Sequence, residues 1–336
     1  MRRCSFLWGL VILASSSSTT AAGDRAKNLE RLSVRLGWQV NANSAGEIAA
    51  LEEGYYQQAG LLVTLNPGGL DFPSVQTVVA GQDQIGFANG PDLVIRARAA
   101  GAPLRIVAVV HQRSSHGFMV RTKSGIRTPK DWEGKRVGVK FASPTYLLYQ
   151  VILKKEGVDR SKIEEVPLKY GLQPFLEGQI DVYPGAFTNE AISLEMMGTD
   201  LSRMDPVDYG INSFGNVMFT TERMIKEHPD IVRRFVQATL RGWEWCLRCE
   251  NHEQAVKYLQ RYSEHLSSGK ELAALRLNID LVAPKELGGN PVGWIDTKKL
   301  QAIVGYMREF GVLEKNIGVD DLVDSQFLRN AKSRGD

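Results

Sequence analysis

The sequence predicts an α/β protein built from two doubly wound lobes, and three observations predict it. First, strand-like and helix-like segments alternate from Arg31 to about Gly117, which favours a parallel sheet with helices on both faces. Second, VVAGQDQIGF and FLEGQIDVYP each place a helix before Gly-Gln and a short apolar strand. Third, about 314 residues remain after an export signal, which is more than one core usually supports.

The first lobe is predicted from alternating apolar runs and helix stops. Gly60, Gly81 and Gly101 stand where glycine commonly ends a helix. The expected strands cover residues 32–38, 61–69, 84–90 and 104–112, and the expected helices cover residues 45–60, 74–82 and 91–101.

The second lobe begins around Phe118 and repeats this pattern. TPKDWEGKRVGVKFASPTY predicts a small helix, a strand and a longer helix, for which Ser143 is a good N-cap and Pro144 a good first residue. A short helix within 171–179 and a strand over 180–187 follow. Apolar residues then recur at helical spacing over residues 228–249, 251–262, 268–282 and 296–313, and we expect these helices to return and pack on the first lobe.

The first 22 residues have the layout of a cleavable secretory signal. Arg2 and Arg3 precede the apolar run FLWGLVILA, and small residues lead to Ala22. We expect Sec export rather than the twin-arginine route, because the pattern flanking the arginine pair is poor. Cys4 precedes the apolar run instead of lying at a cleavage site, so no lipid anchor is expected. The predicted location is the periplasm.

Charge and cysteine content exclude several classes of protein. Removing Arg2 and Arg3 leaves 39 basic and 38 acidic residues, which gives no reason to expect nucleic acid as a partner. Cys246 and Cys249 have CxxC spacing, but the segment predicts a continuous helix without a second CxxC pair. Both are expected to be packing residues, with oxidation to each other an open alternative. No metal site is expected.

The loop NANSAG, after the first predicted strand, carries no charged group and suits a neutral ligand. Asn41 and Asn43 can both donate and accept hydrogen bonds, and Trp38 offers a flat apolar face. The backbone amides at the start of the next helix, around Ser44, add a partial positive end. The alternative is that these asparagines only close the turn and cap the helix.

Other candidate residues also follow predicted strands, where ligands of α/β proteins usually bind. Gly69 would allow close backbone approach, and Arg113, near the first crossover, would clamp an anion or form an ion pair between the lobes. Each also has an ordinary structural explanation. The remaining candidates from both lobes are Phe87, Asn89, Phe141, Ser143, Thr145, Tyr183, Asn189 and Glu190.

Four stretches carry a resemblance to a known family. These stretches are WQVNANSAG before ALEEGYYQQAGL, then AGQDQIGFANG, SGIRTPKDWEGKRVGV, and FVQATLRGWEW with NHEQAV. They resemble the NMT1/THI5-like solute-binding proteins of ABC importers, also called SsuA/THI5-like, over roughly residues 33–315. The resemblance implies a type II periplasmic binding-protein fold with a ligand cleft and two crossovers. It also implies that residues 31–116 and 217–336 form lobe one and that residues 117–216 form lobe two.

The resemblance implies a binding protein that closes on a small ligand and presents it to a membrane permease. Similar members bind thiamine pyrimidine precursors, and riboflavin or sulfonate, taurine and nitrate are the alternatives. Pyrimidine-binding members carry a similar Tyr and Asn-Glu arrangement, so Glu190 is expected to accept from a ligand amine while Tyr183 or Phe187 stacks on the ring. Glu190 facing the cleft would favour an amine-bearing ligand, whereas Arg113 facing it alone would favour an anion.

Eukaryotic members are thiamine pyrimidine synthases, and the sequence departs from their pattern. Their cysteine-rich run aligns with GINSF at 210–214, their cofactor lysine aligns with Ala88, and their histidine position aligns with Asp92. No catalytic motif such as G-x-S-x-G, H-E-x-x-H or a P-loop is present. We therefore expect a monomeric protein that is not an enzyme and needs no cofactor.

Overall fold

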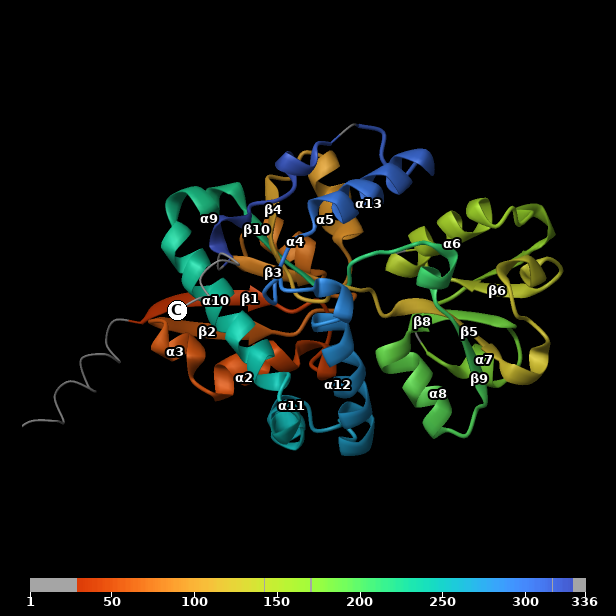
Figure 1. Ribbon diagram of the computed structural model, residues 1–336, viewed down its shortest axis with the longest axis horizontal. Coiled ribbons are helices and arrows are strands. Elements are labelled where there is room, and N and C mark those ends of the chain that lie inside the picture. The colour runs from red at the N-terminus through yellow and green to blue at the C-terminus, as the bar shows by residue number, and fades with distance from the viewer. Residues whose placement is uncertain (1–28, 142, 170, 316, 329–336) are drawn as a thin grey trace, which may run out of the picture.

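Two five-stranded sheets divide the protein into two lobes (Figure 1). The computed structural model describes residues 29–141, 143–169, 171–315 and 317–328. The signal predicted for residues 1–22, with Cys4, lies outside the described residues. None of the helices in the described part of the chain is both long enough and apolar enough to cross a membrane.

The sheet of lobe one has the strand order β2-β1-β3-β10-β4. Strands β1 to β3 pair in parallel, but β10 runs antiparallel to both β3 and β4. The four strands predicted between Arg31 and Gly117 run parallel to one another as expected, and the sheet becomes mixed because β10 enters lobe one on the chain's return from lobe two. The strands are β1 (Glu30–Arg35), β2 (Leu61–Asn66), β3 (Ile85–Ala88), β4 (Leu104–Val109) and β10 (Val217–Thr221).

The sheet of lobe two repeats this plan. Its order is β7-β6-β8-β5-β9, and β5 runs antiparallel to both β8 and β9. In each sheet the first strand after a crossover runs antiparallel to its neighbours. The repeated pattern of helix, Gly-Gln and short strand therefore reflects a topology that the two lobes share. The strands are β5 (His116–Arg121), β6 (Arg136–Val139), β7 (Glu164–Pro167), β8 (Val182–Ala186) and β9 (Leu201–Met204).

Helices cover both sheets, and the C-terminal helices return to lobe one as predicted. Side chains of α10, α11 and α12 share one buried cluster with β1 and β2, and α13 shares another with α5 and β4. The helices of lobe one are α2 (Ala45–Glu52), α3 (Tyr55–Gln58), α4 (Ser74–Val79), α5 (Pro91–Ala99), α9 (Glu222–Glu227), α10 (Pro229–Cys246), α11 (His252–Tyr262), α12 (Ser268–Val282) and α13 (Thr297–Glu309). Those of lobe two are α6 (Pro144–Lys155), α7 (Gln173–Leu176) and α8 (Ile192–Met196), which follows the π-helical turn η5 (Phe187–Ala191).

Two predicted helices are shorter than expected. The helix expected over residues 45–60 is divided at Gly54, whose φ of 69° is left-handed and ends α2. The helix expected over residues 228–249 ends at Cys246, where the Asn251 side chain donates to the Trp245 carbonyl at 2.9 Å. Cys246 is buried, Cys249 is exposed, and both thiols are free, so the oxidised alternative is not seen.

Two chain segments connect the lobes and bond to each other. Residues 110–115 join β4 to β5, and residues 205–216 join β9 to β10. The amide of Val110 donates to the Asn216 carbonyl at 2.9 Å, and the amide of Gly215 donates to the His111 carbonyl at 3.0 Å. We call this pair of connecting segments the hinge.

Candidate functional site

A cleft of about 670 Å³ lies between the lobes, a volume within the range of small-molecule sites. Its walls come from loops at the carboxyl ends of β1, β2, β3, β6 and β8 and from the amino end of the antiparallel strand β5. These are the positions at which α/β sheets bind ligands. The lining residues include Gly37, Trp38, Asn41, Asn43, Gly69, Leu70, Ser74, Asn89, Leu93 and Arg96 from lobe one, and His116, Lys140, Ser143, Gly185, Ala186, Asn189 and Glu190 from lobe two.

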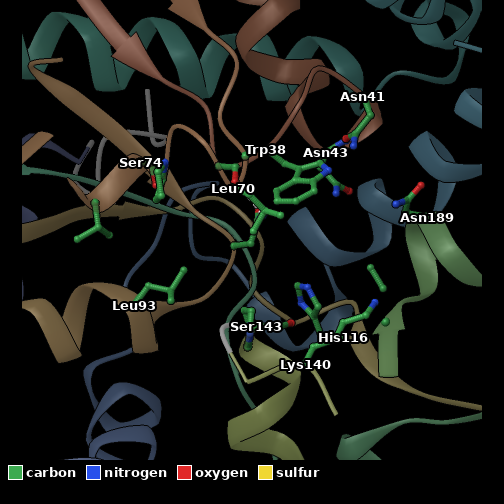
Figure 2. Close-up of a pocket in the computed structure, with 18 of the residues that line it drawn as sticks. Trp38, Asn41, Asn43, Leu70, Ser74, Leu93, His116, Lys140, Ser143 and Asn189 are labelled. Carbon is green, nitrogen blue, oxygen red and sulfur yellow. Dashed lines mark hydrogen bonds between the residues drawn. The ribbon is translucent and has the colours of Figure 1, made fainter. Parts of the chain in front are cut away.

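The NANSAG loop both closes its own turn and lines the cleft (Figure 2). The side-chain Oδ1 of Asn41 accepts from the Asn43 amide at 2.9 Å and so caps the short 3₁₀ turn η1 (Ala42–Ser44). Asn43 and Trp38 also line the cleft.

The backbone amides of Ala42, Asn43 and Ser44 are bonded within the protein, so they do not supply the partial positive end expected around Ser44. The Ala42 amide donates to Glu271 at 2.7 Å, and the Ser44 amide donates to the Asn41 carbonyl at 2.9 Å. Ser44 itself is buried, and its hydroxyl donates to the same carbonyl at 3.0 Å. The loop therefore offers the cleft side-chain amides and an indole rather than these three backbone N–H groups.

Glu190 faces the cleft beside a lysine that the sequence analysis did not select. The Lys140 ammonium is 3.2 Å from the Glu190 carboxylate, and both side chains are mostly buried. Lys140 also donates to the Tyr183 hydroxyl at 3.2 Å, and the other Glu190 oxygen accepts from the Ala186 amide at 3.0 Å. Each carboxylate oxygen has two lone pairs, so both can still accept from a ligand.

His116 completes this wall as a neutral ring. Burial lowers its pKa to about 4, with nearby Glu190 opposing the shift and Lys140 adding to it. Its Nδ1 lies 3.3 Å from the Ser114 hydroxyl. A neutral imidazole can donate or accept one hydrogen bond without adding charge.

Two further candidates line the cleft and are held by local contacts. The Asn89 side-chain nitrogen donates to the Gly37 carbonyl at 3.1 Å. A Cβ at Gly37 would lie 2.7 Å from the Asn89 oxygen, so a larger residue there would displace the Asn89 side chain. Ser143 caps α6 as predicted, with its hydroxyl accepting from the Thr145 amide.

Four aromatic residues that were expected to contact the ligand lie outside the wall of the cleft. Phe87 and Tyr183 are fully buried, since β3 and β8 are covered on both faces. The Tyr183 hydroxyl donates to the Gly171 carbonyl at 2.9 Å. Phe187, the alternative stacking residue, is also buried, so neither it nor Tyr183 lines the cleft. Phe141 is half exposed and lines a neighbouring crevice of about 270 Å³ between α5 and α6.

Two polar candidates are also absent from the wall. Thr145 is buried in the first turn of α6, where its hydroxyl bonds to Ser143. Arg113 lies in the hinge, where its charge opposes the rise in pKa that burial gives Asp205. In the described residues, Arg113 forms no ion pair between the lobes.

The cleft is also lined by three residues that were not among the candidates expected from the sequence, namely Lys140, His116 and Arg96. Lys140 directly follows β6, so the rule that ligands bind at carboxyl ends of strands was the signal that would have found it. His116 begins an antiparallel strand and Arg96 lies within a helix, so this rule selects neither.

The cleft can bind a flat polar molecule, but within the described ranges it does not have the ligand set of a metal. No group of three His, Cys, Asp or Glu side chains in the described chain is placed to hold a metal ion. The described wall instead combines an indole, four asparagine side chains, a neutral imidazole, one Lys–Glu pair and the Arg96 guanidinium.

Comparisons with known proteins agree with this architecture. A formylaminopyrimidine-binding protein of Halalkalibacterium halodurans is 25% identical over 326 residues, covering 96% of this chain and 97% of its own. A 4-amino-5-hydroxymethyl-2-methylpyrimidine phosphate synthase of Legionella pneumophila is 23% identical over 68% of this chain and 72% of its own. The solved alkanesulfonate-binding protein SsuA of Xanthomonas axonopodis, bound to MOPS, superposes with a TM-score of 0.66 at 19% identity, covering 88% of this chain and 99% of that one.

The family model described as NMT1/THI5 like matches residues 41–252, which is more than half of the sequence. The match contains the cleft loop of lobe one, the whole sheet of lobe two and the return strand β10. The chain belongs to the NMT1/THI5-like family, and its two lobes have the type II periplasmic binding-protein fold.

Proposed function

We propose that this protein is the periplasmic solute-binding component of an ABC importer and that it binds a small aromatic heterocycle of the thiamine-pyrimidine type. The observation that carries the proposal is the composition of the cleft, where Trp38 and neutral amides face a wall that contains Glu190. A pyrimidine ring offers a flat face for the indole, ring nitrogens that accept and an exocyclic amine that donates.

The positions of Glu190 and Arg113 favour an amine-bearing ligand over an anion. Glu190 lines the cleft, whereas Arg113 lies in the hinge. A sulfonate or nitrate in this cleft would meet a carboxylate, which repels it. Lys140 and Arg96 partly offset that repulsion, so alkanesulfonates, together with riboflavin, belong in any test.

A binding role without catalysis is the simpler proposal. The relative from Halalkalibacterium halodurans is named a binding protein and matches nearly the whole chain, whereas the relative named a synthase matches 68% of it. Ala88 and Asp92, at two positions that carry synthase chemistry in the resemblance, are buried and do not line the cleft. We further propose export by the signal predicted at residues 1–22, function as a monomer and delivery to membrane permease subunits.

Calorimetric titration of the exported protein, stripped of carried-over ligand, tests the ligand class. The panel is hydroxymethyl- and formylaminomethyl-aminopyrimidine, thiamine, riboflavin, taurine and an alkanesulfonate. We expect tight binding of a pyrimidine and a loss of about 10- to 100-fold in Glu190→Gln, because a hydrogen bond to a charged group is lost.

The matched control is Glu195→Gln. Glu195 is an exposed carboxylate of the same lobe, paired with Arg203 outside the cleft, and its substitution should leave pyrimidine affinity unchanged. Binding of the alkanesulfonate alone would contradict the proposed ligand class.

A further inference from the structure

Helix α12 lies between the two walls of the cleft, far along the chain from the loops that form them. It contacts η1 of lobe one and both η5 and α8 of lobe two, and Figure 1 shows it on the side of lobe one that faces α8. Near its C-terminal end, the Leu281 carbonyl accepts from the Gln112 amide of the hinge at 2.7 Å. One helix thus touches both walls and the hinge.

Two consecutive residues of α12 make the contacts to the two walls. The Lys270 ammonium donates to Oδ1 of Asn189, in lobe two, at 2.7 Å. Glu271 accepts from the Ala42 amide, in the lobe-one loop, also at 2.7 Å. Glu271 is only 2% exposed, and burial raises its pKa. Because Glu271 is fixed in the wall of lobe one, Lys270 reaches Asn189 from a defined position.

The contact with Lys270 determines which end of the Asn189 amide is available. An ammonium group only donates, so the atom that faces it must be the amide oxygen. The Asn189 side-chain nitrogen has no partner among the residues that the structure describes, and Asn189 lines the cleft. Figure 2 shows that nitrogen on the side of the cleft and the oxygen turned away from it.

The amides on the opposite wall are oriented in the same manner, by contacts within the protein. The Asn41 oxygen accepts from the Asn43 amide, which leaves the Asn41 nitrogen to donate. The Asn89 nitrogen donates to the Gly37 carbonyl, which leaves the Asn89 oxygen to accept. Three cleft amides therefore have a defined polarity when the lobes are arranged as in this structure.

We propose that Lys270 is a positioning residue that holds the Asn189 amide as a hydrogen-bond donor to the ligand. The cleft then selects a heterocycle with an acceptor, such as a ring nitrogen or a carbonyl, on the edge that faces lobe two. This assignment rests on the proposed function and specifies the ligand's hydrogen-bonding pattern. Asn189 contacts the ligand, and Lys270 acts through it.

Substitution of Asn189 tests whether its amide donates. The probes are hydroxymethyl-aminopyrimidine and the matching aminobenzyl alcohol, in which the ring nitrogens are replaced by C–H groups. A carboxylate cannot donate, so Asn189→Asp should weaken pyrimidine binding about 10-fold, as much as Asn189→Leu does. Wild-type or tighter pyrimidine binding by Asn189→Asp would overturn the assignment.

Substitution of Lys270 tests the positioning role through the ratio of the affinity for the pyrimidine to the affinity for its benzene analogue. Lys270→Met should weaken pyrimidine binding about 3- to 10-fold and leave the benzene analogue unchanged, because only the pyrimidine uses the oriented donor. Lys270→Arg, which still donates, should restore the ratio, and Lys257→Met, at an exposed lysine of α11, should not change it. An unchanged ratio in Lys270→Met would overturn the assignment.

A spectroscopic measurement on the pyrimidine-saturated protein, in which the lobes are closed, separates failure of this assignment from failure of the proposed function. The side-chain amide signal of Asn189 in a ¹⁵N–¹H spectrum, identified by its loss in Asn189→Leu, should shift in Lys270→Met and stay near its place in Lys257→Met. An unmoved signal in Lys270→Met would overturn the positioning role even if a pyrimidine binds. Absence of pyrimidine binding by the wild-type protein would instead overturn the proposed function and, with it, the ligand pattern.

Discussion

Glu47 is an unusual residue in the core of lobe one. Its side chain is fully buried on α2, and neither carboxyl oxygen has a hydrogen-bond partner in the described structure. Burial raises its pKa to about 8, and the nearby indole N–H of Trp243 opposes the shift without reaching hydrogen-bond geometry. Glu47 is therefore protonated at neutral pH, since a charged carboxylate without a partner is costly in a core.

This pKa predicts the pH dependence of stability. Between the ordinary value of 4.5 and the folded value of about 8, the folded protein retains a proton that the unfolded chain has lost. The free energy of unfolding should therefore fall as pH rises through this window, by several kcal/mol in total, and level off above it. Burial lowers the pKa of His111 from 6.5 to about 3. Its effect on the free energy of unfolding has the opposite sign and is confined to pH values below 6.5, where stability rises with pH.

Urea unfolding between pH 6.5 and pH 8 isolates Glu47, and Glu47→Gln is the matched variant because its amide resembles the protonated carboxyl in shape. Wild-type protein should lose stability across that interval, whereas the variant should lose much less and be the more stable protein at pH 8. Equal slopes for the two proteins would show that Glu47 is not the group that titrates.

At the scale of elements, the close packing of α2 on α10 depends on two glycines. A Cβ at Gly46 would lie 2.2 Å from the Trp243 ring, and a Cβ at Gly242 would lie 2.0 Å from the Gly46 carbonyl oxygen. Neither distance is possible for real atoms, so any larger residue must force the two helices apart. The turn η1, whose Asn43 lines the cleft, leads directly into α2. A change in the separation of α2 and α10 should therefore also affect the cleft.

Alanine substitution should therefore have opposite effects at matched glycines. Gly46→Ala should lower the free energy of unfolding by about 1–3 kcal/mol or more, the usual cost of overpacking. Gly305→Ala, within α13 and with open space around its Cβ, should raise it by about 0.5–1 kcal/mol because alanine favours the helix. Thermal or urea denaturation of both variants measures this, and equal destabilisation of both would contradict the packing argument.

The sequence predicted the order and type of most elements but not where some of them end. Gly60, Gly81 and Gly101 follow helices with φ of 74°, 73° and 100°, as their spacing predicted. Gly54 has the same left-handed conformation within an apolar pattern that continues beyond it, so the division there was missed. The end of α10 depends on the Asn251 side chain, which becomes its partner only after the chain has turned.

The alternation of helices and strands predicted the parallel strands β1 to β4 but not the antiparallel strands β5 and β10, because side-chain alternation is the same in both directions. The antiparallel strands β5 and β10 follow the crossovers, and their direction is a property of the whole chain path.

At the scale of the whole molecule, the site was only partly predictable. Trp38, Asn43 and Glu190, which were expected from their places after strands, line the cleft. Phe87 was misplaced because β3 is buried on both faces, so the pattern does not show which side chain meets a ligand. The contact of Lys270 with Asn189 joins residues 81 positions apart in different lobes, and no local pattern encodes it.

A small heterocycle that binds between the lobes should hold them together. Closure requires contacts that exist only when both walls meet the ligand, such as Trp38 on one side and Glu190 on the other. A ligand that bound one lobe alone would not shift the equilibrium between open and closed forms.

Small-angle X-ray scattering with and without hydroxymethyl-aminopyrimidine, at a concentration shown by calorimetry to saturate the protein, tests this most directly. We expect a smaller radius of gyration with ligand, and no change for Trp38→Ala at the same concentration, because its site is not filled. An unchanged radius of gyration for the saturated wild-type protein would contradict ligand-driven closure of the lobes.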